Sequence, residues 1–127
     1  MTLDEFNTLC AGLPQTTKVI QWMGCHVWKV GDKVFAIGAP GVDVQGKQPG
    51  ETPCPFTIKT DEMAFGFLRE EPNVDIAPHL KRGNWLRFEA DCAIDFKDLS
   101  AYIERSHALI VNTLTKKKRE ELGLAQH

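Results

Sequence analysis

The segment APHLKRGNWLRF, residues 77–88, gathers side chains that suit binding chemistry. Lys81, Arg82 and Arg87 could pair with phosphate oxygens, and the indole of Trp85 could stack on a base or on a cation. His79 lies in the same stretch and is typical of a hydrogen-bonding loop residue. Two interpretations follow: an anion or nucleic-acid contact, or a surface turn in which the tryptophan serves as a packing anchor.

Other chemistry is poorly supported by the residues present. The two serines, Ser100 and Ser106, both lie in the predicted last helix, and no G-x-S-x-G motif exposes a nucleophile. Residues 41–47 fit G-x-x-x-x-G-K, but Gln48 follows where a phosphate loop needs Ser or Thr. The four cysteines stand singly, without zinc-ligand spacing. We therefore predict no catalytic residues, no cofactor and no metal site.

Composition indicates an ordinary globular chain. It has 127 residues, 43% hydrophobic and 25% charged, which suits a single domain over residues 1–127. The formal net charge is -2, so binding to nucleic acid would depend on a local basic patch. No apolar run approaches the roughly 20 residues of a membrane span, and the acidic N-terminus does not resemble a secretory signal. We expect a cytoplasmic protein with reduced thiols and no membrane partner, and we expect Cys54, between two prolines, on an accessible loop.

Hydrophobic periodicity predicts the elements that must position these side chains. A helix should begin near Thr2, with Glu5 completing a capping box. A second helix should begin at Thr60 or Asp61, and a third at Asp95. Gly31 and Asp32 should form a tight hairpin turn. The cationic run 115–122 reads as the end of the last helix followed by a tail. The predicted helices cover 2–13, 61–71 and 95–114; the predicted strands cover 16–22, 25–30, 33–38, 55–60 and 84–90, with a short strand at 42–44 inside the long loop 38–55.

This order of elements predicts an α+β fold, an antiparallel sheet with the N- and C-terminal helices packed on one face. Alternation along 84–90 places Leu86 and Phe88 toward the core and Trp85 and Arg87 outward. Lys59 should point outward from the neighbouring strand. The uncovered face would then carry Lys59, Trp85 and Arg87 as a binding platform.

Four segments, taken in order, resemble the MmcQ/YjbR family. They are WKVGDKVFA (28–36), PFTIKT (55–60), APHLKRGNW (77–85) and SHALIVNTLTKKKR (106–119), and they span most of the chain. The resemblance implies a frataxin-like (CyaY-like) α+β fold and DNA binding through a double-wing motif, and it brings no catalytic residues. The chain departs from the family pattern in its longer loop 38–55, where a wing would lie, and in His107, where tyrosine is common.

Two non-enzymatic functions remain open at this point, and an enzyme is a third possibility that a polar cleft with a strongly shifted pKa would support. The first is a small non-enzymatic protein that contacts DNA, with the cations on phosphates and the indole stacked or packed. The second is a protein-interaction or small-ligand module that uses the open sheet face and loop 38–55, which the near-neutral charge favours. The residues predicted for DNA contact are Lys59, His79, Lys81, Arg82, Trp85 and Arg87.

Overall fold

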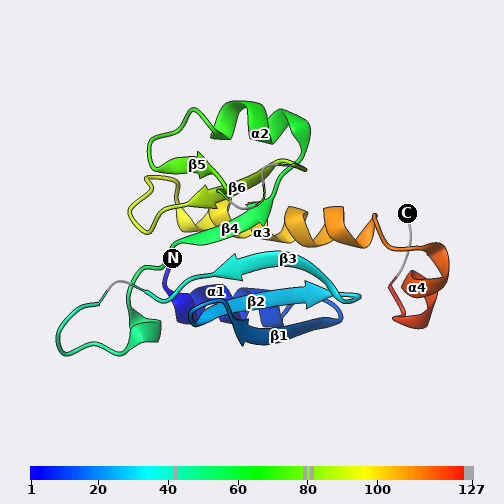
Figure 1. The fold of residues 1–127 in the computed structure, drawn as a ribbon, viewed down its shortest axis with the longest axis horizontal. Helices are drawn as coiled ribbons and strands as arrows, with labels where there is room; N and C mark the ends of the chain where they lie inside the picture. The colour runs from blue at the N-terminus through cyan, green and yellow to red at the C-terminus, as the bar shows by residue number, and fades with distance from the viewer. Residues whose placement is uncertain (42, 79, 81, 125–127) are drawn as a thin grey trace.

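The computed structural model describes residues 1–41, 43–78, 80 and 82–124, apart from the side chain of residue 49. These residues form a six-stranded sheet in the order β1-β2-β3-β4-β6-β5, in which all neighbouring strands are antiparallel (Figure 1). The α+β class is confirmed. The strands are β1 (Thr16–Gln21), β2 (Cys25–Val30), β3 (Lys33–Gly38), β4 (Phe56–Lys59), β5 (Val74–Ile76) and β6 (Trp85–Phe88); the helices are α1 (Leu3–Ala11), the 3-10 turn η1 (Pro49–Glu51), α2 (Glu62–Leu68), α3 (Phe96–Val111) and α4 (Lys116–Glu121).

Side chains at the helix starts explain where the first three helices begin. Thr2 and Glu5 form the predicted capping box, each bonding the other's backbone N–H. Asp61 caps α2, and Asp95 caps α3 through the N–H of Asp98. Each of these oxygens satisfies a donor that a helix start would otherwise leave unpaired.

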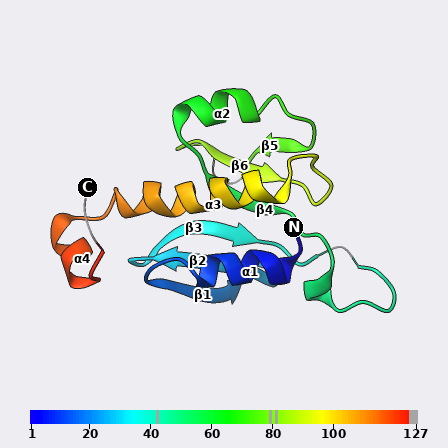
Figure 2. The same cartoon turned by 180° about the vertical axis from the view of Figure 1, so that it is seen from behind.

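Helices α1 and α3 lie side by side on one face of the sheet, in front of the strands in Figure 2. This confirms the predicted packing. Phe56 stacks on Phe88 with ring centroids 5.1 Å apart, and Phe6 of α1 lies 5.6 Å from Phe56. Ile103 of α3 is fully buried in the same core. Within the described part of the chain, no helix is both long and apolar enough to cross a bilayer.

Several predicted boundaries were wrong. Helix α3 ends at Val111, and the cationic run belongs to a separate helix, α4, which Thr115 caps. Strand β5 was not predicted, because three residues are too few to show alternation. Asp43 and Val44 lie outside any strand, and Val42, the first residue of that predicted strand, lies outside the described residues.

Cys54 is buried, so the prediction of an accessible thiol was wrong. Its N–H donates to the Met1 carbonyl at 3.0 Å, and Pro53 next to it forms a β-bridge with Thr2. Burial raises the pKa of the Cys54 thiol to about 11. The prolines indicate an irregular segment, but this segment packs beneath the N-terminus instead of facing water.

Candidate binding surfaces

The sheet register brings three of the predicted site residues to one face. Lys59 pairs with Trp85, and Thr57 pairs with Arg87, while the residues that alternate with them are buried beneath the helices. Strands β4 and β6 therefore carry Lys59, Trp85 and Arg87 on the face away from α1 and α3. His79 and Lys81, the other members of the predicted loop, lie outside the described residues.

The ammonium of Lys59 already has partners in the fold. Its Nζ donates to the carbonyl of Gly83 at 2.8 Å and lies 5.6 Å from the centroid of the Trp85 ring. The indole is half-buried and packs against the core cluster. This geometry matches the packing-anchor interpretation of Trp85 and leaves its lysine engaged.

Arg87 is also engaged. Its Nε donates to Glu89 at 2.9 Å, and its register partner on β5 is Asp75. Arg82 differs, because it is exposed and forms no ion pair with the described residues. The predicted basic cluster is therefore a set of internally paired cations with one free arginine among the described residues.

A second surface lies at the opposite edge of the sheet, on β1 and the turn after it. We call residues 16–24, which are strand β1 and the turn that joins it to β2, the edge hairpin. Trp22 is 58% exposed and Met23 is 98% exposed, and the turn that carries them has positive φ at three successive residues: 52° at Trp22, 63° at Met23 and 85° at Gly24. Left-handed backbone at bulky residues costs free energy and commonly marks functional sites.

The strand before this turn adds apolar surface. Val19 is 42% exposed and Ile20 is 58% exposed, so four of the five residues from 19 to 23 are large exposed hydrophobics. This surface was not predicted, because Trp22 was expected within the strand 16–22, whereas β1 ends at Gln21. The tripeptide WMG between two β-branched stretches was the available signal, since a glycine there indicates a turn that carries the two large residues before it.

A polar cluster supports the inner side of the same hairpin. Asn7 of α1 accepts from the indole Nε1 of Trp28 at 2.9 Å, and its Nδ2 lies 3.0 Å from Nδ1 of His26. The Nζ of Lys18 lies 6.0 Å from the centroid of the Trp28 ring. Burial, and then the charge of Lys18, lowers the pKa of His26. The contacts of Asn7 fix β2 against α1, and Lys18, although exposed, lies on the same side of the sheet as Trp28.

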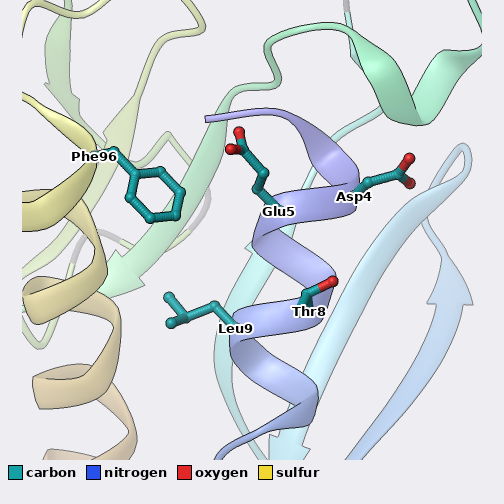
Figure 3. Close-up of a pocket in the computed structure, with 5 residues that line it drawn as sticks. All are labelled: Asp4, Glu5, Thr8, Leu9 and Phe96. Atoms are coloured by element: carbon teal, nitrogen blue, oxygen red, sulfur yellow. The ribbon is translucent and has the colours of Figure 1, made fainter.

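A shallow groove of about 300 Å³ lies between α1 and α3 (Figure 3). Leu9 and Phe96 face each other across it, and Asp4, Glu5 and Thr8 line the α1 side. The carboxylate of Glu5 is committed to the N–H of Thr2 at 2.8 Å. Among the described residues, no three His, Cys, Asp or Glu side chains are placed to hold a metal ion. The groove offers apolar contact and no evident reactive group.

Fold and surfaces together define a small α+β protein with one helix-covered sheet face and exposed clusters near both ends of the strand order. The sequence profile of the YjbR family matches residues 11–109, and the chain belongs to that family. A crystal structure of the Deinococcus radiodurans protein DR2400, with domain DUF419, is similar, with a TM-score of 0.77 and 21% identity over 98% of this chain and 89% of that one. A crystal structure of a Pseudomonas syringae protein has a TM-score of 0.66 and 19% identity over 86% of this chain and 98% of that one. At these identities the two structures support the fold alone. A comparison with curated proteins found no match.

Proposed function

We propose that this chain is a protein-binding module and that its binding surface is the edge hairpin. The observation that carries the proposal is the display of Trp22 and Met23 on a strained turn at the end of an exposed edge strand. The proposal takes residues 1–127 as one domain of a cytoplasmic protein, to which its four free cysteines are suited.

The physical argument concerns the free energy that is lost when apolar side chains remain exposed to water. Exposed apolar patches of several hundred Å² are uncommon on monomers and are frequently interaction sites. Tryptophan is among the residues that contribute most to binding at interface centres, and methionine adapts to irregular surfaces. A short turn with a fixed backbone also loses little conformational entropy on binding.

A site-specific photo-crosslinker in living cells tests this proposal. The reactive residue replaces Met23 in one variant and Met63 in the control. Met63 is 80% exposed on α2, which follows β4 in the chain, and β4 does not neighbour β1 in the sheet. We expect protein adducts at position 23 and few at position 63. Equal yields at the two positions, or no adduct at position 23, would exclude the edge hairpin as a protein-binding surface.

DNA binding is a second candidate, and one observation favours it: Arg82 is exposed, and it forms no ion pair with the residues that the structure describes, beside the turn where Lys59 meets Trp85. A fluorescence anisotropy titration with duplex DNA at low and moderate salt is the test, because phosphate contacts weaken steeply with salt. Arg82→Gln should weaken binding, while Arg69→Gln, at an exposed arginine after α2, should not. Absence of binding at low salt would end this candidate.

A further inference from the structure

We infer that the partner of the edge hairpin is a second copy of this chain. Strand β1 of one copy pairs antiparallel with β1 of the other across a two-fold axis at Val19, which joins the two sheets into one. This inference rests on the proposed function, since it names the partner of that surface. Three features carry it: the state of the sheet's two edges, the register that symmetry allows and the apolar area available.

The two edges of the sheet differ in their protection. Strand β5 is three residues long, carries Asp75 and is flanked by Pro72 and Pro78, which are devices that prevent edge pairing. Strand β1 is six residues long and contains no proline or acid. Its one charge, Lys18, is exposed and lies 6.0 Å from the centroid of the Trp28 ring, on the side of the sheet that faces α1. No strand within the described residues pairs with the outer side of β1, which remains open to another strand.

Symmetry restricts how two such strands can pair. A two-fold axis perpendicular to the sheet pairs residues whose numbers have an even sum, because opposite side chains must share a face. With the axis at Val19, Thr17 pairs with Gln21, and Lys18 lies beside Ile20 of the other copy, whose apolar side chain can cover the lysine stem. With the axis at Lys18, two like charges would be opposed, which is destabilising. Of these two registers, the one centred on Val19 is favoured, because it opposes no like charges.

The available area fits a weak, specific dimer. The exposed parts of Val19, Ile20, Trp22 and Met23 offer on the order of 500 Å² of apolar surface per copy, so that two copies with their paired backbones approach the roughly 1,200 Å² at which specific interfaces begin. In the same register the paired strands end at Gln21, and the left-handed turn that begins at Trp22 lies beside the start of the other copy's strand. Pairing therefore brings the exposed side chains of each turn next to the other copy.

Disulfide trapping tests the register directly. In the Val19→Cys variant the two introduced thiols lie opposite each other, with Cα atoms about 5 Å apart, a separation that a disulfide spans. In the matched Thr17→Cys variant the thiols lie four strand positions apart, at about 13 Å. Both variants are made with Cys25 and Cys92 replaced by serine, because those native thiols are partly accessible. We expect on the order of tenfold more disulfide-linked dimer from the Val19 variant under mild oxidation.

Association of the unmodified chain is measured by sedimentation velocity between about 1 and 300 μM, where an interface of this size should associate. The sedimentation coefficient should rise with concentration for the native chain and for Met63→Lys, but not for Val19→Lys, which places two cations at the axis. A monomer at all concentrations, or equal trapping at positions 17 and 19, would overturn the inference. Photo-adducts at Met23 with a different protein, without dimer, would overturn this inference and leave the proposed function standing. Absence of any adduct would overturn both.

Discussion

Replacement of Ser106 by alanine should lower the free energy of unfolding by about 2–6 kcal/mol, because its hydroxyl joins two strands where their own pairing stops. The β3–β4 pairs end at Ala36 and Ile58, next to the β-bulge of β3. Beyond that point the Oγ of Ser106 donates to the Phe35 carbonyl at 2.6 Å and accepts from the Lys59 N–H at 3.0 Å.

The magnitude follows from what alanine leaves behind. Ser106 is completely buried, so removal of its hydroxyl leaves one backbone carbonyl and one backbone N–H without a hydrogen-bond partner and out of reach of water. Each unsatisfied buried backbone group costs about 1–3 kcal/mol. A domain of this size has about 5–15 kcal/mol of stability in total, so the change removes a large share of it.

Ser100 provides the matched control on the same helix. Its Oγ is a buried atom without a hydrogen-bond partner among the described residues. Ser100→Ala should leave stability unchanged or raise it by about 0.5 kcal/mol, because alanine has the higher helix propensity. Urea denaturation followed by circular dichroism measures both variants. If Ser106→Ala cost less than about 1 kcal/mol, or no more than Ser100→Ala, the bridging role would be refuted.

Three further predictions concern single sites. Gly31→Ala should lower the free energy of unfolding by about 1–3 kcal/mol, because φ is +57° and an added Cβ would lie 2.8 Å from Leu114; an unchanged melting temperature would contradict this. Because burial raises the pKa of Cys54 to about 11, a thiol reagent at neutral pH should modify Cys25 before Cys54, as peptide mass spectrometry can show. Equal rates of modification at Cys25 and Cys54 would contradict the buried placement of Cys54. The N–H at the start of α2, and then a guanidinium of α3, lower the pKa of Asp61. The stabilisation that ionised Asp61 gives the fold should therefore be present at neutral pH and be lost as the pH falls through the folded pKa. Asp61→Asn should reduce the loss of stability at acid pH in a plot of unfolding free energy against pH, and an unchanged loss would contradict this.

The fold was largely predictable because its signals are local. Capping residues such as Thr2 and Asp95 act within one turn, and apolar alternation marks which strand residues face the helices. The α+β class follows from element order. Strand β5 could not be predicted, since three residues carry no periodicity and its pairing with β6 is a tertiary contact. The spacing of Phe96 also fits the buried face of α3, yet this residue is 49% exposed, because it lies on the first turn of the helix and lines the groove.

The binding surfaces were less predictable, because their properties depend on pairing between distant segments. The residues of 77–88 are visible in the sequence, but the carbonyl that holds the Lys59 ammonium is 24 positions away from it. The exposure of Val19 follows from the position of β1 at the edge of the sheet. The order of strands in a sheet cannot be deduced from the residues of any single strand. Residue type identified candidate cations, and only the fold showed which of them already bond or contact other groups of the chain.

The two surfaces differ in how far the binding of a ligand disturbs contacts that exist within the free chain. One N–H of the Lys59 ammonium is committed to the Gly83 carbonyl, and the ammonium lies near the ring of Trp85, so a phosphate at this residue either shares the ammonium with these partners or displaces it from them. Displacement would leave the Gly83 carbonyl unpaired, unless water replaces the lysine, in a turn where Gly83 has φ of +90°. The edge hairpin requires no such exchange, because its apolar side chains and the outer side of β1 face water in the free chain. Binding there releases water from apolar surface without breaking an internal contact, and on this physical ground the edge hairpin is the stronger candidate.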